Sequence, residues 1–325
     1  MRFLALQQNN MLKLVNIAMS KRINLLLPFT FLIMVSLVLS ATNIFYKAIP
    51  TVYAQTNSAG LASHVLVANG GNTTTKTTIT NEGLEVKKDV KYFDGASGYL
   101  VYPSTIAAVS TTTGATGKKL PAVIMIHENR GINDNIRNMA NTLAKQAGYV
   151  ILAVDLFKGV STNDPSQAMQ LVKSVRGNPQ EAISNLQAAV KYLSSLPFVD
   201  SSKIASIGWC FGGGQSLQLA LHSEQHPLVA TILYYGSPLV TDKQELSKIK
   251  WPVLGIFGDH DQAIPLQQIN MFKAALDADG ITNQIQIYKG LGHAFANPSG
   301  TNYAPKQTAD AWEKTLAILK KYVQS

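Results

Sequence analysis

The chain has 325 residues, 46% of them hydrophobic and 14% charged, a composition typical of a globular protein with one large or two ordinary domains. The formal net charge is +9, but the first fifty residues hold five basic side chains and no acidic one. The remaining 23 basic and 19 acidic side chains leave only about +4, which does not indicate nucleic-acid binding. A single cysteine, Cys210, excludes a disulfide within the chain.

Residues 1–54 have the features of a targeting segment. Lys21-Arg22 precedes an apolar run from Ile23 to Ser40, and Val52-Tyr53-Ala54 offers small residues at the positions that a signal peptidase reads. A run of this length could also cross a bilayer. We therefore expect either a signal peptide cleaved near Ala54 or an N-terminal membrane anchor, with the protein secreted or held on the outer face of the cell membrane.

The next segment, residues 55–82, is rich in Thr, Asn, Gly and Ser and is predicted to be a flexible spacer, with a glycosylation sequon at Asn72. From residue 83 to residue 325, short apolar or β-branched runs alternate with amphipathic segments. We expect strands at Leu84–Phe93, Gly98–Tyr102, Leu120–His127, Tyr149–Phe157, Lys203–Trp209, Leu228–Tyr235, Trp251–Phe257 and Gln284–Tyr288.

Helical spacing of apolar residues recurs within residues 132–147, 183–193 and 312–323. The first two predicted strands have no helix between them, as in an antiparallel pair. The later strands are apolar throughout, which is typical of parallel strands covered by helices on both faces. The sequence therefore predicts one α/β domain over residues 83–325, with a mostly parallel eight-stranded sheet and no separate lid domain.

The strongest local signal is Gly208-Trp209-Cys210-Phe211-Gly212-Gly213-Gly214, between a predicted strand and a predicted helix. It has the G-x-nucleophile-x-G pattern of the α/β-hydrolase elbow, with cysteine in place of serine. Glycines are expected there because the nucleophile lies in a strained turn and its near neighbours must lack a Cβ. A buried, inert cysteine on a glycine-rich turn is the alternative reading.

Candidates for an acid and a base follow in the chain order nucleophile, acid, histidine. Asp261 comes after the predicted strand that ends at Phe257, and His293 comes after the one that ends at Tyr288. Both therefore lie at the edge where open parallel sheets carry their sites. Asp259 is the alternative acid, although we expect it in a turn or in solvent. The other histidines considered are expected at the surface, in turns or in the spacer: His64, His222, His226 and His260.

From about Glu85 to the C-terminus the sequence resembles the dienelactone hydrolase (carboxymethylenebutenolidase-like) family of α/β-hydrolases. The matching motifs are Ile126-His127-Glu128-Asn129-Arg130-Gly131, Val154-Asp155-Leu156-Phe157, Gly208-Trp209-Cys210-Phe211-Gly212-Gly213, Gly258-Asp259-His260-Asp261 and Gly292-His293-Ala294-Phe295. The resemblance implies an enzyme that cleaves small carboxylic esters or lactones through an acyl-cysteine intermediate, without a cofactor. The sequence has no HExxH, CxxC or Walker pattern, so no metal is expected.

The resemblance also implies roles for individual residues. Cys210 would be the nucleophile, His293 its base, and Asp261 the carboxylate that orients His293. Glu128 would contact the resting thiol and move when substrate binds, although from its position alone it could instead cap the helix after Gly131. The backbone N–H groups of Phe211 and Asn129 would form the oxyanion hole.

Lactone hydrolases of this family hold a substrate carboxylate with two arginines, one after the Asp-Leu-aromatic motif and one just beyond the catalytic histidine. Here Asp155-Leu156-Phe157-Lys158-Gly159 and His293-Ala294-Phe295-Ala296-Asn297 contain neither arginine. Lys158 could substitute only as a point charge, and Arg130 and Arg176 are other available cations. Dienelactone itself is therefore not the expected substrate.

Two other functions remain open on the sequence. The chain could be a catalytically silent, membrane-tethered binding protein with a hydrolase-like fold, or an acyltransferase that uses the same triad. The expected partner is a small-molecule ester or lactone, and the expected state is a monomer or homodimer.

Overall fold

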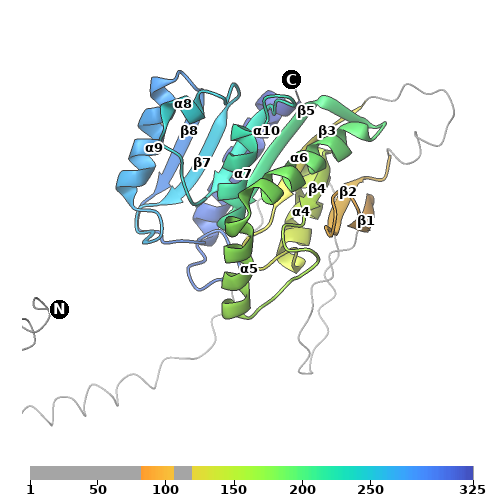
Figure 1. Cartoon of the computed structure of the whole chain (residues 1–325), viewed down its shortest axis with the longest axis horizontal. Helices are drawn as coiled ribbons and strands as arrows, with labels where there is room; N and C mark the ends of the chain where they lie inside the picture. The colour runs from red at the N-terminus through yellow and green to blue at the C-terminus, as the bar shows by residue number, and fades with distance from the viewer. Residues whose placement is uncertain (1–81, 106–118, 325) are drawn as a thin grey trace, which may run out of the picture. The chain divides into compact units, whose positions relative to one another are not determined.

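The computed structural model shown in Figure 1 describes residues 82–105 and 119–324. The predicted leader (residues 1–54), its cleavage site near Ala54, nearly all of the predicted spacer (residues 55–82) and the sequon at Asn72 lie outside the described residues. Within the described ranges, no helix is both long enough and apolar enough to span a membrane.

The described strands form one eight-stranded sheet in the order β1-β2-β4-β3-β5-β6-β7-β8. Antiparallel pairing joins β1 to β2 and β2 to β4, and all other neighbours are parallel. The predicted mostly parallel sheet is confirmed. The strands are β1 (Leu84–Val90), β2 (Gly98–Pro103), β3 (Leu120–Ile126), β4 (Val150–Val154), β5 (Val199–Trp209), β6 (Ala230–Tyr234), β7 (Val253–Gly258) and β8 (Asn283–Tyr288).

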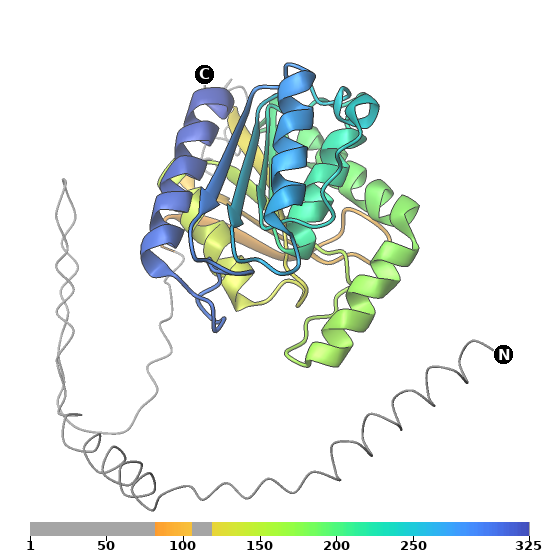
Figure 2. The same ribbon diagram turned by 90° about the vertical axis from the view of Figure 1, so that its left-hand side faces the viewer.

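Helices cover both faces of the sheet, as Figure 2 shows. On one face lie α4 (Asp134–Ala147) and α10 (Pro305–Val323); on the other lie α6 (Pro179–Ser195), α7 (Phe211–Leu221) and α9 (Leu266–Ala278). The two remaining described helices are α5 (Pro165–Gly177) and the short α8 (Lys243–Leu246). With helices on both sides, the central strands are buried throughout, which explains their continuous apolar sequences.

Two strands end well before the residue that the sequence predicted. The strand expected to reach Phe157 stops at Val154, because the buried Asp155 carboxylate accepts the backbone N–H groups of Phe157 (2.9 Å) and Gly159 (2.6 Å) and turns the chain. The strand expected to reach Phe93 stops at Val90, after Asp89 adopts a positive φ of 57°. In both places apolar residues continue past the strand, so hydrophobicity alone could not mark its end.

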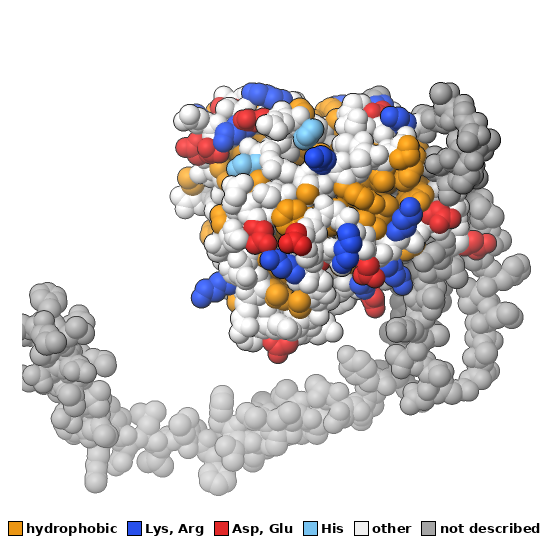
Figure 3. Space-filling view, turned by 45° about the vertical axis from the view of Figure 1, so that its right-hand side comes forward, with side chains coloured by type: hydrophobic (Ala, Val, Ile, Leu, Met, Phe, Trp, Pro, Cys, Tyr) orange, Lys and Arg blue, Asp and Glu red, His pale blue; other side chains and the backbone are white. Residues whose placement is uncertain are grey.

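Loops at the carboxyl-terminal edge of the sheet carry the candidate site. Helix α5 extends beyond this edge, below the strand ends in Figure 1. The face shown in Figure 3 carries acidic and basic side chains side by side, with no extended area of one charge. That mixture agrees with the modest net charge of the chain without its first fifty residues.

Candidate active site

Cys210 lies in a strained turn between β5 and α7. Its backbone angles are φ 54° and ψ −119°, a conformation that residues with a side chain rarely adopt. The flanking glycines permit the turn: a Cβ on Gly208 would lie 2.1 Å from the carbonyl oxygen of Gly212, and a Cβ on Gly212 would lie 2.4 Å from the carbonyl oxygens of Ile126 and His127. The first turn of α7 can therefore pack directly against the end of β3. The turn at Cys210 thus has the geometry that the sequence predicts for the elbow.

The structure brings together Cys210, His293 and Asp261 from three separate loops. The Nε2 atom of His293 lies 3.1 Å from Sγ of Cys210, and Nδ1 lies 2.7 Å from Oδ2 of Asp261. The other carboxylate oxygen of Asp261 accepts the backbone N–H groups of Ala263 (2.8 Å) and Ile264 (3.2 Å). Because the Asp261 side chain is fully buried and held from both sides, it fixes the orientation of the imidazole ring.

Opposing influences set the proton affinity of His293. Burial, the largest single influence, lowers the pKa of His293. The hydrogen bonds to Asp261 and Cys210 and the charges of these two groups outweigh it and raise the pKa to about 10. The imidazolium form is thus favoured beside a negatively charged sulfur, which is the state that follows transfer of the thiol proton to Nε2.

The alternative acid and the other histidines have other surroundings. Asp259 lies in the turn after β7, as expected, and its carboxylate accepts the backbone N–H of Gly290 at 2.6 Å, which links this turn to the loop after β8. The side chain of His260 is 72% exposed. His222 contacts the carbonyl oxygen of Gln218 through Nδ1 at 2.9 Å, at the end of α7. His226 lies in the loop after it, and His64 lies outside the described residues.

Glu128 is buried beside the site but pairs with Asn297. Only 5% of Glu128 is exposed, and its Oε2 accepts the Nδ2–H of Asn297 at 2.7 Å. Burial raises the pKa of Glu128 to about 7, against the smaller lowering effects of His293, Arg130 and Asn297. Among the described residues Glu128 is hydrogen-bonded to Asn297, and no hydrogen bond joins it to Cys210. The contact with the resting thiol that the resemblance implies stays a prediction.

The alternative role for Glu128, as the cap of the helix after Gly131, is wrong. The helix begins at Asp134, and its cap is Asn133, whose side chain accepts the backbone N–H of Ile136 at 3.1 Å. The Glu128 side chain instead reaches a residue that follows His293 in the chain.

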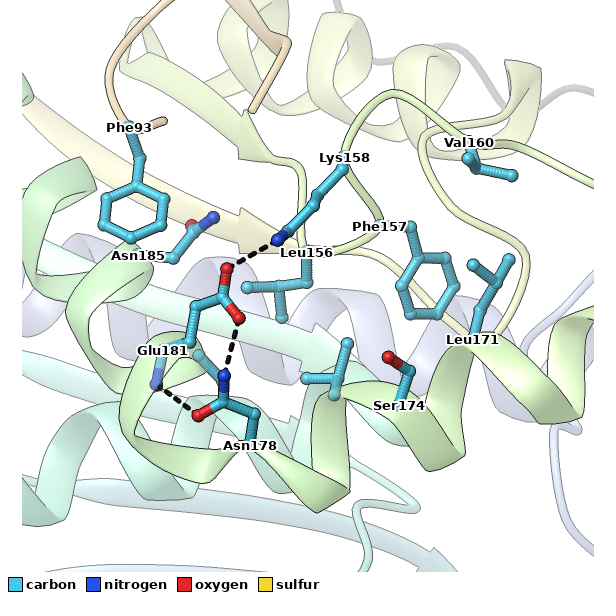
Figure 4. Close-up of a pocket in the computed structure, with 12 residues that line it drawn as sticks. Phe93, Leu156, Phe157, Lys158, Val160, Leu171, Ser174, Asn178, Glu181 and Asn185 are labelled. Carbon is cyan, nitrogen blue, oxygen red and sulfur yellow. Dashed lines mark hydrogen bonds and ion pairs between the residues drawn. The ribbon is translucent and has the colours of Figure 1, made fainter. Parts of the chain in front are cut away.

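Each of the three candidate substrate-binding cations has a partner within the described residues. Lys158 forms an ion pair of 2.7 Å with Glu181 across a neighbouring pocket, drawn in Figure 4. Arg130 donates to the carbonyl oxygen of Asn163 at 2.6 Å, and Arg176 donates to that of Ser237 at 3.1 Å. Arg130 lies near enough to Glu128 to lower the pKa of that carboxyl.

The oxyanion-hole candidates are two backbone N–H groups. Phe211 is the first residue of α7, where N–H groups have no partner within the helix. Neither the N–H of Phe211 nor that of Asn129 donates to another atom of the described chain. The positive end of the α7 dipole adds to the attraction for an anion beside Cys210.

Sequence reasoning assigned no role to His127, which is fully buried next to Glu128. Its Nε2 accepts the backbone N–H of Leu156 at 3.2 Å, so its Nδ1 carries the proton and donates to the carbonyl oxygen of Glu128 at 2.5 Å. Burial lowers the pKa of His127 and keeps the ring neutral. His127 thereby holds the backbone around Glu128 and Asn129; the His-Glu motif was its only signal in the sequence.

Sequence reasoning also missed Tyr235, which follows β6. Tyr235 has a positive φ of 36°, and its ring centroid lies 5.1 Å from that of His293. Its hydroxyl is buried near the backbone N–H of Ala296 but makes no hydrogen bond of ordinary geometry to a described residue. Burial raises the pKa of Tyr235 well above its ordinary value, and the charges of Glu128 and Cys210 raise it further. No pattern in the sequence distinguishes this tyrosine from the buried Tyr234 before it.

A strained strand–turn–helix junction at the carboxyl-terminal edge of a mostly parallel sheet is characteristic of the α/β-hydrolase fold. The model of the Dienelactone hydrolase family matches residues 106–323. The chain belongs to the dienelactone hydrolase family and is a hydrolase. In the described residues, no cluster of His, Cys, Asp and Glu side chains is arranged to hold a metal ion.

Known relatives agree with this assignment. The chain is 28% identical over 209 residues to Protein usf of Aquifex pyrophilus, a match that covers 62% of this chain and 89% of the relative. It is 29% identical over 240 residues to a Saccharolobus solfataricus protein provisionally named a carboxymethylenebutenolidase, again covering 62% of this chain and 89% of the relative.

Solved structures show the same fold. A dienelactone hydrolase-like promiscuous phosphotriesterase from metagenomic libraries superposes with a TM-score of 0.64 at 24% identity, covering 74% of this chain and 99% of that one. A structure from Klebsiella pneumoniae, provisionally named a dienelactone hydrolase, superposes with a TM-score of 0.62 at 23% identity and the same coverage.

Proposed function

We propose that the protein hydrolyses small, neutral carboxylic esters or lactones through an acyl-cysteine intermediate, with Cys210 as nucleophile, His293 as base and Asp261 as the orienting carboxylate. The observation that carries the proposal is the unbroken chain of contacts from Sγ to Nε2 (3.1 Å) and from Nδ1 to Oδ2 (2.7 Å). These are the distances that proton transfer between a nucleophile, a base and its orienter requires.

In the first half of the reaction the thiol proton passes to Nε2 of His293 and Sγ attacks the carbonyl carbon. The negative charge that develops on the carbonyl oxygen is held by the N–H groups of Phe211 and Asn129. The tetrahedral intermediate collapses when the carbon–oxygen bond to the alcohol breaks, and His293 donates its proton to that oxygen. The alcohol leaves, or in a lactone becomes the free end of the opened ring.

In the second half His293 takes a proton from water, and the resulting hydroxide attacks the acyl-cysteine. Collapse of the second tetrahedral intermediate breaks the carbon–sulfur bond, releases the acid and returns the proton to sulfur. Asp261 is not protonated in either half, because its role is to hold the ring and to stabilise the imidazolium.

The surroundings of the site support a neutral substrate. Asn297 lies where the family's lactone hydrolases have an arginine beyond the histidine, and its amide is used by Glu128. Lys158 is neutralised by Glu181. A substrate carboxylate would therefore meet the Glu128 carboxyl without the two arginines that hold it in the family's lactone hydrolases. We expect neutral esters to be hydrolysed at least as well as matched esters that bear a carboxylate.

Turnover of p-nitrophenyl acetate by the purified protein tests the proposal. Cys210→Ala and His293→Ala should each lower kcat by several orders of magnitude while the protein stays folded, because the members of a triad act as a unit. His260→Ala is the matched control, because its side chain is exposed, and it should retain wild-type activity. A Cys210→Ala protein that keeps a tenth or more of the wild-type kcat would overturn the assignment.

The same assay separates two alternatives. If added alcohols yield new esters faster than free acid, the chain is an acyltransferase that shares the covalent half-reaction. If the folded wild-type protein turns over no member of a panel of esters and lactones, it is a silent binding protein. We further propose export or anchoring through residues 1–54; a native N-terminus near Gln55 would support cleavage, and an intact N-terminus on membranes would support the anchor.

A further inference from the structure

A pocket of about 370 Å³ lies beside the candidate active site and contains none of the triad residues. Its walls come from the loop after β4, from α5, from the first turns of α6 and from Phe93 after β1. Because β1, β4 and β5 run in the same direction, this pocket opens at the same edge of the sheet as Cys210. Its volume falls within the range of roughly 300–1,000 Å³ found for small-molecule sites.

The chemistry of the lining indicates a neutral, largely apolar ligand. Figure 4 shows Leu171 of α5 beside Phe157, and Lys158 extending across to Glu181. The charges of Lys158 and Glu181 neutralise each other at 2.7 Å, and Glu181 also accepts the side-chain N–H of Asn178 at 2.7 Å. No further charged residue lines the pocket. An ionised ligand would gain little here, whereas an apolar one would gain by leaving water.

Aromatic packing connects the pocket to the catalytic groups. Phe157 lines the pocket, and its ring centroid lies 5.4 Å from that of Phe211, which follows Cys210. It lies 4.5 Å from the centroid of His127, which precedes Glu128. One aromatic layer therefore separates the pocket from the residues that flank the nucleophile.

Helix α5 also borders both sites. Its residues Leu171, Ser174 and Val175 line the pocket, whereas its Arg176 donates to the carbonyl oxygen of Ser237 at 3.1 Å. Ser237 packs against the first turn of α7, since a Cβ on Gly214 would lie 2.3 Å from the Ser237 carbonyl oxygen. Helix α5 therefore contacts both the pocket and the loop that packs against the first turn of α7.

We infer that this pocket binds the apolar part of a neutral ester whose carbonyl group lies at Cys210, and that it sets the enzyme's preference for the length of that part. The inference rests on the proposed esterase function. The Lys158–Glu181 ion pair borders the pocket and makes it unsuitable for a carboxylate, because a carboxylate would have to displace Glu181.

Two ester series test the inference. In p-nitrophenyl esters the acyl group grows from acetyl to hexanoyl, and in alkyl acetates the alcohol grows from methyl to pentyl. If the pocket buries the four added methylenes, kcat/KM should rise on the order of a hundredfold along one of the two series. Ser174→Trp, at an exposed position that lines the pocket, should reduce that rise to less than tenfold.

Two further variants sharpen the test. Gln180→Trp is the matched control, because Gln180 is exposed in the first turn of α6 but does not line the pocket, and it should keep the wild-type profile. Ser174→Leu fills less space and should give an intermediate profile; it replaces Ser174→Trp if the larger residue prevents folding. Each variant's acetate turnover reports whether its catalytic site is intact.

The inference fails if Ser174→Trp and wild type show the same chain-length profile in both series, or if Gln180→Trp alters the profile as much as Ser174→Trp. Either result would leave the esterase proposal standing, provided that acetate turnover still depends on Cys210. Loss of that dependence would instead refute the proposed function, so the two failures are distinguishable.

Discussion

The buried carboxyl of Glu128 should make the stability of the protein depend on pH. Burial raises the pKa of Glu128 from 4.5 to about 7. Because the folded pKa is above the unfolded one, the favourable contribution is fully present below about pH 4.5 and is lost as the pH rises through about 7. At 1.36 kcal/mol for each unit of pKa, the loss amounts to about 3 kcal/mol.

Glu128→Gln removes the charge and keeps an oxygen that can accept the Asn297 amide. We expect the variant to have nearly the wild-type free energy of unfolding at about pH 4.5 and to be more stable by about 3 kcal/mol at about pH 8.5. Urea unfolding of both proteins across this range, with reductant present to protect Cys210, measures the difference.

The control is Glu181→Gln, the same substitution at a side chain that is 37% exposed and paired with Lys158. Its pH dependence should be weak and of opposite sign, because pairing with Lys158 lowers the pKa of Glu181. The reasoning is refuted if Glu128→Gln changes stability equally at both ends of the range, or if the variant is the less stable protein at high pH.

Three further pairs of measurements follow from the site. Asp261→Asn should lower kcat far more than Asp259→Asn, because only Asp261 contacts His293; equal losses would mean that the acid is misassigned. Tyr235→Phe should leave the free energy of unfolding unchanged or higher. Tyr234→Phe breaks a 2.7 Å hydrogen bond with Thr315 and should lower the free energy of unfolding by about 1 kcal/mol. Urea unfolding measures both, and the reverse order would contradict the structure. Asn297→Arg should raise kcat/KM for carboxylate-bearing esters relative to neutral ones by about tenfold, because one charge-assisted hydrogen bond contributes roughly that much. An unchanged ratio would show that Asn297 does not face the substrate.

Most of the fold could be predicted because buried parallel strands have continuous apolar sequences. All five residues of β4 are buried, and the predicted strand contains them. The predicted strand was too long because Leu156 and Phe157 are also buried, although they lie in a loop that the Asp155 carboxylate fixes by hydrogen bonds. Burial is common to strand and loop here, and only the hydrogen bonds of one carboxylate separate them.

The triad candidates could be found from the sequence because each follows a recognisable strand, and strand ends meet at one edge of a sheet. The contacts of the other charged residues could not be predicted from the sequence. Glu128 meets Asn297, which is 169 positions away, through the path of the loop after His293. Lys158 meets Glu181 because α6 begins beside the β4 loop. Such contacts depend on how loops pass one another, and no periodic pattern of residues encodes that.

Trapping of the acyl-enzyme tests the central claim most directly. Wild-type protein mixed with p-nitrophenyl acetate is quenched in acid during turnover, digested, and its peptides are mapped by mass spectrometry. The account predicts one added acetyl group, on the peptide that contains Cys210, formed at least as fast as steady-state turnover and absent in Cys210→Ala. Full turnover without acetylation of Cys210, or acetylation only at another residue, would contradict it.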